Sequence, residues 1–299
     1  MSTVAFIGFG ELGSALAGAL REQGGMAVRA FSRPARDAAA AEALEARLSA
    51  AGADRADSIA EAFAVAEAVL AVMPPAASED VARECAPHLD AEAVYADLTA
   101  APPAVKQAGA EAVAEHGALY ADVAVLGTVA ASGAAVPLLA SGPGAHAFRR
   151  LVAPAGLRVT AIDAPAGHAS LVKLLRSVYM KGRDALVLEM MAAARHHGLD
   201  RVVAESIAGP GEEVPFPALA ERILSALAVH AERRAHELGS AAAIVRGTGV
   251  EPLVTEAGVA RLERLAALGL RERLGGERPA SADEVLAALD ELSDRVAGG

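Results

Sequence analysis

Three glycines near the start of the chain, at positions 8, 10 and 13, constrain its fold more than any other feature. They follow directly on the apolar run VAFI at 4–7, which predicts a buried strand, and they open an amphipathic stretch to about Gln23 that predicts a helix. In this strand–turn–helix context a G-x-G-x-x-G turn is typical of dinucleotide binding. The first glycine permits the tight turn, the second lets a pyrophosphate approach the backbone, and the third lets helix and strand pack closely. The residues predicted to hold the cofactor at this turn are Gly8, Phe9, Gly10, Glu11, Leu12 and Gly13.

Strand and helix signals alternate up to about residue 117, which predicts a doubly wound α/β domain. Strands are expected at 27–31, 69–73, 94–97, 119–125, 136–141 and 157–162. Helices between the last three are short or absent, so that half of the sheet is expected to be partly antiparallel. After Pro165 the strand signals stop, and helices are expected over 167–197, 218–238, 240–247, 252–268 and 281–296.

The fold class predicted from this pattern is α/β with a second, helical domain. Residues 1–165 are expected to form an NADP-binding Rossmann domain with a mostly parallel sheet. Residues 166–299 are expected to form an all-helical domain for substrate binding and dimerisation, joined to the first by a long central helix.

Composition restricts the partners that the chain can have. Hydrophobic residues make up 54% of it and the net charge is -11, which argues against nucleic acid or an anionic membrane as the main partner. A small anionic ligand stays compatible, because a local pocket can oppose the overall sign. A single cysteine, Cys85, excludes an internal disulfide and a multi-cysteine zinc site, so no metal is expected and a reducing cytoplasm fits. The uncharged stretch 123–145 is interrupted by four glycines and two prolines, which indicates short buried strands and no membrane span.

The end of the second predicted strand carries the signal for cofactor choice. Ser32 and Arg33 lie roughly 20 residues past the glycines, where folds that prefer NAD place an acid for the ribose 2'-hydroxyl. A hydroxyl and a guanidinium would instead bind a 2'-phosphate, so NADP(H) is predicted over NAD(H). The alternative is that Arg33 is a solvated loop residue. Two further strand ends are expected to line the same carboxyl edge of the sheet, with Met73, Pro74 and Thr99.

A polar stripe crosses the apolar surface of the predicted central helix. Lys173, Ser177, Lys181 and Asp184 are three or four residues apart, so they share one helical face. Burial among apolar neighbours would lower the pKa of Lys173 and let it act as a base near neutral pH. A solvated helix face is the competing interpretation.

A second helical segment offers candidate substrate contacts. His230 and Arg234 are four residues apart in HAERRAHEL, so they could reach an anionic substrate from the helical domain. Here too the alternative is a solvated face.

Taken together, these segments resemble the β-hydroxyacid dehydrogenases, which include 6-phosphogluconate dehydrogenase and 3-hydroxyisobutyrate dehydrogenase. The resemblance rests on IGFGELG at 7–13, FSRPARD at 31–37, VMPP at 72–75 with ADLTAAPP at 96–103, and AGHASLVKLLRS at 166–177. The C-terminal part looks like a less characterised, phosphogluconate dehydrogenase-like branch. The resemblance implies that Lys173 is the catalytic lysine, that Thr99 touches nicotinamide and substrate, and that Gly167 opens the central helix.

Two positions depart from the family pattern. Ser177 stands where the family usually has asparagine, and a serine hydroxyl has a shorter reach to a substrate oxygen. Leu126 replaces the serine that usually anchors the substrate carboxylate, which puts the usual 3-hydroxycarboxylate specificity in doubt. Thr128 and backbone amides near Gly127 are the expected substitutes.

The predicted function is an NADP(H)-dependent oxidoreductase that moves hydride between the nicotinamide and a small 3-hydroxy acid, or a phosphorylated or carboxylated alcohol. Lys173 is the expected general acid/base, and Ser177 is expected to hold the same substrate oxygen. An imine reductase on the same architecture and a non-catalytic nucleotide-binding module are the alternatives. A homodimer is expected, because family members pair through the helical domain. The expected substrate contacts are Thr99, Leu126, Gly127, Thr128, Lys181, His230 and Arg234.

Overall fold

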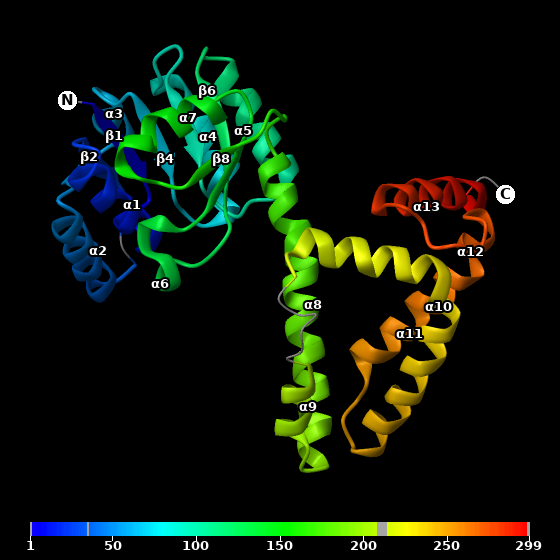
Figure 1. Ribbon diagram of the computed structural model, residues 1–299. Helices are drawn as coiled ribbons and strands as arrows, with labels where there is room; N and C mark the ends of the chain where they lie inside the picture. Colours follow the sequence, from blue (N-terminus) through cyan, green and yellow to red (C-terminus); the bar gives the residue numbers. More distant parts are fainter. Residues whose placement is uncertain (1, 35, 208–213, 298–299) are drawn as a thin grey trace. The chain divides into compact units, whose positions relative to one another are not determined.

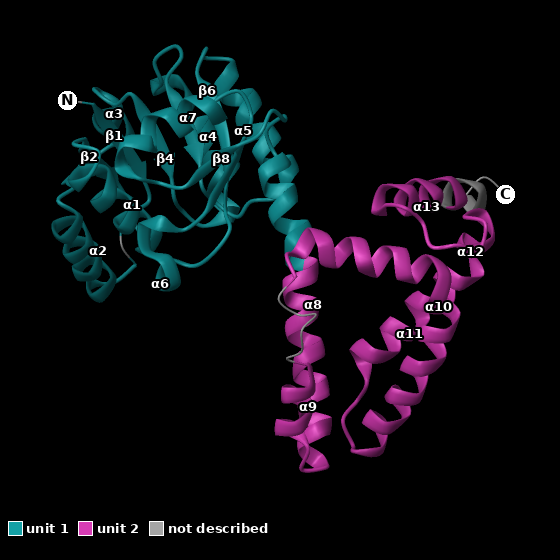
Figure 2. Ribbon diagram, in the orientation of Figure 1, with its two compact units in different colours: residues 1–177 teal, residues 178–299 magenta. Residues whose placement is uncertain are grey.

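A computed structural model of the protein describes residues 2–34, 36–207 and 214–297 (Figure 1). The chain divides into two compact units, residues 1–177 and 178–299 (Figure 2). The division falls inside one long helix, α8 (His168–His196), so that residues 168–177 of this helix belong to the first unit. The first unit is α/β and the second is helical, which agrees with the predicted fold class.

Within the described residues, the first unit contains one eight-stranded sheet with the strand order β3-β2-β1-β4-β5-β6-β7-β8. Neighbouring strands are parallel except for β6 and β7, which are antiparallel. The predicted mixture of a mostly parallel sheet with an antiparallel part is therefore confirmed. The strands are β1 (Thr3–Ile7), β2 (Ala27–Phe31), β3 (Asp54–Arg55), β4 (Ala68–Ala71), β5 (Val94–Asp97), β6 (Leu119–Val125), β7 (Leu138–Ser141) and β8 (Val159–Ala161).

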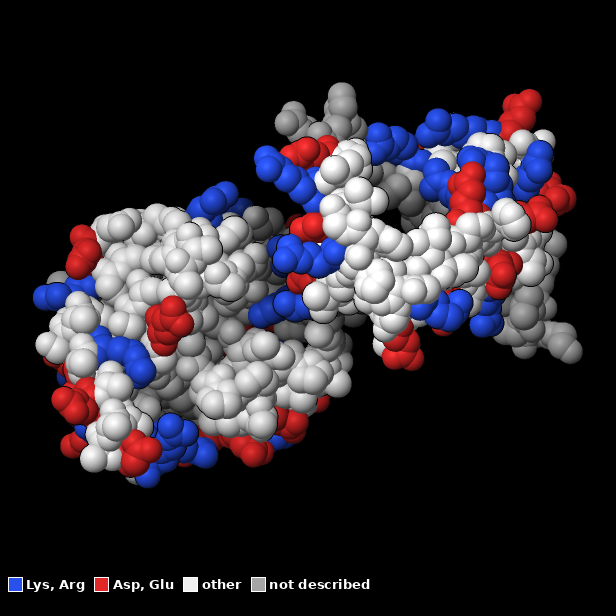
Figure 3. Space-filling model, turned by 90° about the horizontal axis from the view of Figure 1, so that it is seen from below, with Lys and Arg blue, Asp and Glu red and all other residues white. Residues whose placement is uncertain are grey.

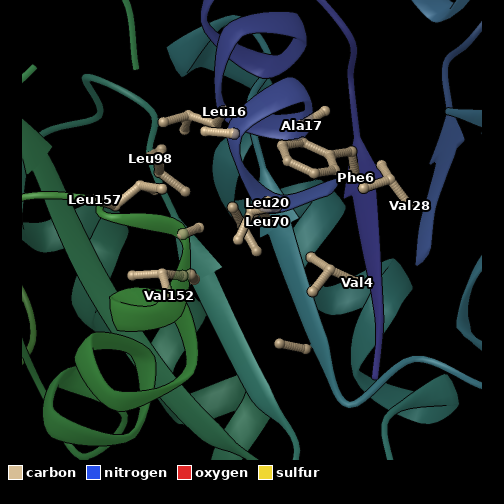
Figure 4. Close-up of a cluster of buried hydrophobic side chains, with 14 of the residues drawn as sticks. Val4, Phe6, Leu16, Ala17, Leu20, Val28, Leu70, Leu98, Val152 and Leu157 are labelled. Atoms are coloured by element: carbon tan, nitrogen blue, oxygen red, sulfur yellow. The ribbon is translucent and has the colours of Figure 1, made fainter. Parts of the chain in front are cut away.

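Apolar side chains point alternately to the two faces of this sheet, and each face is covered by helices. Val4, Phe6 and Leu70 point to the face that packs against α1, α2 and α7 (Figure 4). Ala5 and Ile7, the residues between, point to the face covered by α3, α4 and α5. The helices of this unit are α1 (Glu11–Glu22), α2 (Ala38–Ala51), α3 (Ile59–Phe63), α4 (Ser78–Cys85), α5 (Pro103–Ala114), α6 (Val129–Ser132) and α7 (Ala145–Val152).

Several element boundaries differ from the prediction. The strand expected at 69–73 ends at Ala71, since Pro74 has no backbone N–H to continue a ladder. Met73 and Pro74 therefore lie beyond the end of β4, on the carboxyl edge of the sheet. The short elements β3 and α3 were not predicted, because two to five residues carry too little periodicity to detect.

The described part of the helical unit comprises the end of α8 and five further helices. The helices expected at 218–238 and 240–247 form one continuous element, which is bent at His230, where φ is -120° and ψ is 18°. An additional helix follows α8 that was not predicted. The helices are α9 (Asp200–Ile207), α10 (Phe216–Gly247), α11 (Leu253–Ala267), α12 (Leu270–Arg273) and α13 (Ala282–Ala297).

Carboxylates satisfy the free N–H groups at the starts of two helices in the helical unit. Glu189 is buried on α8 and accepts hydrogen bonds from the backbone N–H groups of Val254 (2.8 Å) and Thr255 (3.0 Å), in the first turn of α11. Ser281 accepts from the N–H of Glu284, as in a capping box, and Glu284 in turn accepts from the N–H of Ala280. Side chains therefore fix where α11 and α13 begin.

Much of the apolar surface of α8 is exposed. Leu175, Val178 and Leu188 have 62%, 73% and 73% of their surface accessible. On the face seen in Figure 3 the helical unit also shows a broad uncharged area between groups of charged side chains. The helix has the predicted apolar periodicity, and within the described part of the chain these residues stay exposed.

Candidate active site

The three glycines after β1 have the geometry that a dinucleotide-binding turn needs. Gly8 has a φ of +83°, and a Cβ at this position would lie 2.4 Å from the carbonyl oxygen of Val72, so no other residue fits. A Cβ on Gly10 would meet nothing within 4 Å, which leaves open space in front of the first turn of α1. A Cβ on Gly13 would lie 3.5 Å from the Gly8 carbonyl oxygen, an ordinary contact. The turn therefore leaves the N-terminus of α1 accessible to an anionic group.

A cavity of about 550 Å³ lies beside this turn and is entirely within the first unit. Its size is within the usual range for small-molecule and cofactor sites. The predicted residues among its lining are Gly8, Phe9, Gly10, Ser32, Arg33, Met73 and Pro74. Glu11, Leu12, Gly13 and Thr99 are not part of this lining. The cavity thus gathers three strand ends, those of β1, β2 and β4, which fits the adenosine part of a dinucleotide.

Two charged residues of this cavity were not predicted. Glu84 on α4 accepts a hydrogen bond from the guanidinium of Arg33 at 3.1 Å, and both side chains are more than half exposed. Arg47 on α2 also lines the cavity. A nucleotide phosphate near Arg33 would therefore have a second arginine beside it and a carboxylate competing for the first.

A buried ion cluster is formed by Asp97 at the carboxyl end of β5, Asp122 on the neighbouring strand β6 and Lys106 on α5, and all three side chains are inaccessible to solvent. The Nζ of Lys106 lies 2.8 Å from both the carbonyl oxygen and Oδ1 of Asp97, and 3.5 Å from Oδ1 of Asp122. Asp97 also accepts hydrogen bonds from Ser78 Oγ, Tyr120 OH and the N–H of Thr99. Burial by itself would raise the pKa of Asp97, but Lys106 and these hydrogen bonds lower it overall.

Asp122 connects this cluster to the start of α8. Its Oδ2 accepts hydrogen bonds from the N–H of Gly167 at 3.1 Å and of Ser170 at 2.9 Å, and its Oδ1 accepts from Ser170 Oγ at 2.7 Å. A Cβ on Gly167 would lie 2.8 Å from the carbonyl oxygen of Pro103, so α8 begins in contact with the first residue of α5. A strand-borne carboxylate thus caps α8 from a position 45 residues earlier in the chain.

Lys173 lies one turn further along α8 than Ser170 and is half-buried. Burial lowers the pKa of Lys173, as does the positive charge of Lys106, and the opposing effect of Asp122 is smaller. Among the described residues, no carboxylate lies within ion-pair distance of its amine. Lys173 is therefore partly desolvated, as its apolar neighbours in the sequence predict, and its role in the reaction stays a prediction.

Comparison with known proteins assigns this architecture to a family. Residues 3–154, just over half of the chain, match the NAD binding domain of 6-phosphogluconate dehydrogenase. The chain belongs to the β-hydroxyacid dehydrogenase-like family. It is thus an NAD(P)-dependent oxidoreductase of the hydroxyacid dehydrogenase type.

Several solved structures resemble the chain over most of its length. A conserved hypothetical protein from Sinorhizobium meliloti is 31% identical, with a TM-score of 0.61 over 90% of this chain and 88% of that one. A conserved protein of unknown function described as similar to 3-hydroxyacid dehydrogenases is 25% identical, with a TM-score of 0.61 over 89% and 97%. The imine reductase of Myxococcus stipitatus, in complex with NADP+, shares the fold at 22% identity, with a TM-score of 0.70 over 95% and 98%. A variant of that enzyme is known in complex with NAD+.

Residues 194–265 match a domain of unknown function (DUF1932). No curated protein matches the chain. The family assignment therefore rests on the model that matches residues 3–154.

The remaining predicted residues of this β-hydroxyacid dehydrogenase-like chain have varied environments. Thr99 is buried, and its hydroxyl accepts from the N–H of Ala101 at 3.3 Å. Ser177 donates its hydroxyl to the carbonyl oxygen of Lys173 at 2.9 Å, so it would have to rotate to donate to a substrate. Leu126 is partly buried in an apolar cluster with Ala124, Leu139 and Ala169. The other predicted substrate contacts are Gly127 and Thr128, both exposed before α6; Lys181 and His230, both exposed; and Arg234, partly buried.

Lys181, His230 and Arg234 belong to the second unit, so their part in a substrate site stays a prediction. Among the described residues, no cluster of three potential metal ligands occurs. In the same part of the chain no helix is both long and apolar enough to cross a membrane. Burial raises the pKa of the Cys85 thiol to about 12, which makes the single cysteine unreactive at neutral pH.

One signal in the sequence could have revealed the buried cluster of this dehydrogenase-like site. The chain contains only three lysines, at positions 106, 173 and 181, and the rest of its 27 Lys and Arg residues are arginine. Arginine stays charged in proteins, whereas a lysine amine can lose its proton when it is buried. Lysine in a chain that otherwise uses arginine therefore marks positions where a compact or titratable amine is needed. Lys106 also stands alone on the apolar face of its helix, among Gly109, Ala112 and Val113.

Proposed function

We propose that the protein is an NADP(H)-dependent oxidoreductase that interconverts a small 3-hydroxy acid, or a related phosphorylated or carboxylated alcohol, with its oxo form. The observation that carries this proposal is Lys173, a half-buried amine with a lowered pKa on a helix that begins at the carboxyl edge of the sheet. Ligands of doubly wound α/β domains bind at this edge. A non-catalytic module would have no use for a titratable amine here.

Lys173 serves as the general acid/base of the reaction. The nicotinamide, when bound, accepts hydride from the substrate carbon in oxidation and returns it in reduction. In oxidation, neutral Lys173 takes the proton of the substrate hydroxyl as the C–H bond breaks. In reduction, protonated Lys173 gives this proton to the developing alkoxide. The lowered pKa increases the fraction of neutral Lys173 near neutral pH, which the oxidation needs.

Residues near Lys173 would orient the substrate. Ser177, one turn along α8, could hold the same substrate oxygen after its hydroxyl leaves the Lys173 carbonyl. Lys181, a further turn along, is suited to an anionic tail. Thr128 and the backbone N–H groups near Gly127 would take the place of the serine that Leu126 replaces.

The preference for NADP(H) rests on the cavity beside β2. Ser32, Arg33 and Arg47 offer a hydroxyl and two guanidinium groups to a 2'-phosphate. Glu84 opposes this binding, because it competes for Arg33 and repels a phosphate. The preference is therefore expected to be moderate.

Imine reduction is the second candidate. It is favoured by Leu126, whose apolar cluster replaces a polar anchor for a carboxylate and so suits a substrate without one. Reductases of known imine activity share the fold of the chain, as the Myxococcus stipitatus enzyme illustrates. Lys173, rather than the aspartate or tyrosine usual in those enzymes, keeps this candidate second.

A substrate panel tests the proposal. Purified protein is assayed with NADPH and with NADH against small 3-oxoacids and against cyclic imines. Turnover of 3-oxoacids, faster with NADPH, supports the proposal. Turnover of imines alone supports the second candidate, imine reduction, instead. A protein that binds NADPH but reduces neither class would contradict both oxidoreductase proposals in favour of a nucleotide-binding module.

A homodimer completes the proposal. The exposed apolar residues of α8, among them Leu175, Val178 and Leu188, would be covered by a second copy of the chain. The low number of cysteines fits the cytoplasm as the compartment.

A further inference from the structure

The complete burial of the Lys106 side chain is unusual for a charged residue. It has no accessible surface, and a fully buried cation costs free energy that an apolar side chain of the same size would not. Its three oxygen neighbours come from two different strands, the carbonyl and carboxylate of Asp97 on β5 and the carboxylate of Asp122 on β6. Lys106 therefore holds two neighbouring strands together at the point where α8 begins.

We propose that Lys106 is a positioning residue for Lys173: through Asp122 it fixes the first turn of α8, and its buried charge disfavours a second ammonium group on Lys173. The contacts form an unbroken series from Lys106 to Asp122, from Asp122 to the N–H and hydroxyl of Ser170, and from Ser170 one helical turn to Lys173. The inference rests on the proposed role of Lys173 as the acid/base.

The charged groups around Lys173 act in opposite directions. Lys106, on α5, lowers its pKa and Asp122, on β6, raises it. Asp97, on β5, is bound to Lys106, and Tyr120, on β6, donates to Asp97. Burial and the charge of Asp97 raise the pKa of Tyr120, which therefore stays a neutral donor. The cluster thus contains one cation and two carboxylates, and only the cation works against protonation of Lys173.

Both carboxylates keep hydrogen-bond donors when Lys106 is replaced. Asp97 would keep three, from Ser78, Thr99 and Tyr120. Asp122 would keep four, from Ser141, Gly167 and twice from Ser170. A neutral residue at position 106 therefore removes the buried cation while these contacts to the start of α8 remain, which should stabilise the ammonium form of Lys173.

The three-lysine composition makes a direct test possible. The full chain is labelled with ¹³C-lysine, and the Cε signals are assigned with the Lys173→Met and Lys181→Arg variants and followed from pH 6 to 11. In Lys106→Gln, whose amide can still donate to Asp97, the titration midpoint of Lys173 should rise by on the order of 1 pH unit. In Asp122→Asn it should fall. Lys106→Arg, which keeps the charge, and Lys181→Arg, an exposed substitution on α8, should leave it unchanged.

Opposite shifts in the two variants are a result that loss of packing alone would not give. A Lys173 midpoint within about 0.2 units of wild type in folded Lys106→Gln would overturn the proposal. If Lys106→Gln does not fold, the shift in Asp122→Asn tests the proposal instead. A Lys173 midpoint that does not fall in Asp122→Asn would also overturn it. The experiment measures the titration of the amine and not turnover. Its result therefore remains valid even if Lys173 has no part in catalysis. In an active enzyme, Lys106→Gln should also move the rising limb of the oxidation pH profile to higher pH.

Discussion

At the scale of single residues, the functional positions are marked by departures from what their surroundings favour. Gly8 adopts a backbone conformation that other residues avoid, beside a carbonyl that leaves no room for a Cβ. Lys106 is a buried cation, and Lys173 is a half-buried amine without a carboxylate partner among the described residues. Arg33 and Glu84 form an exposed ion pair at the rim of the nucleotide cavity. Exposed pairs contribute little to stability, so a role in cofactor choice explains this pair better.

The pair gives a prediction for cofactor affinity. In Glu84→Gln, Arg33 is released and a negative charge near the 2'-phosphate is removed, so the Kd for NADPH should fall by about 3- to 10-fold, the effect of one exposed charge contact. The Kd for NADH should change little. Isothermal titration with both cofactors measures this. Glu79→Gln is the matched control, since Glu79 lies on the same helix but pairs with Arg83. Equal gains for NADH and NADPH would show that Glu84 does not sense the 2'-phosphate.

At the scale of elements, local patterns predicted the strands well and the helix starts less well. The apolar runs around β1, β5 and β6 predicted those strands, and the G-x-G-x-x-G turn predicted a nucleotide site at the end of β1. The caps of α8 and α11 could not be predicted, because Asp122 and Glu189 reach helix starts 45 and 65 residues later in the chain. Only the folded sheet and the packed helices bring these groups together.

The cap of α11 gives a prediction for stability. Glu189→Gln removes the charge that faces the N-terminus of the helix, and should lower the free energy of unfolding of the helical unit by about 1–2 kcal/mol. Burial alone would raise the pKa of Glu189, but its hydrogen bonds to Thr255 and Val254 lower it overall. The cap is therefore complete above the ordinary carboxylate pKa and is lost as the pH falls below it.

Hydrogen exchange at the Val254 and Thr255 amides, together with urea unfolding, measures the effect of Glu189→Gln. Exchange at both amides should become faster. Glu263→Gln, an exposed change on the same helix, serves as the control. Unchanged exchange at the two amides would mean that the carboxylate charge contributes nothing to the cap.

At the scale of the whole molecule, two units of different character share one helix. The end of the strand signals predicted a domain boundary at residue 165, and the two compact units of the structure meet at residue 177. The first turns of α8 belong to the first unit because Asp122 binds them. The apolar spacing of α8 was visible in the sequence. The sequence did not show whether that surface faces the chain's own core or a second chain, since periodicity alone does not distinguish the two.

The exposed surface of α8 gives a prediction for assembly. Light scattering after size-exclusion chromatography should report a dimer for the wild-type chain and a monomer for Leu188→Glu, because a carboxylate would be buried without a partner in the interface. Leu286→Glu, at another exposed leucine on α13, should leave the dimer intact. A wild-type monomer at micromolar concentration would refute the dimer.

The central claim is that the amine of Lys173 moves the proton in hydride transfer, and turnover of Lys173→Met tests it most directly. With the substrate that the panel identifies, kcat should fall by about 10²- to 10⁴-fold, the usual contribution of a positioned acid/base. The Kd for NADPH should stay within about 2-fold of wild type, since Lys173 is not part of the nucleotide cavity. Arg176→Met, an exposed change on the same helix, is the control and should retain most of the activity. A kcat for Lys173→Met close to that of the wild-type enzyme would contradict the account.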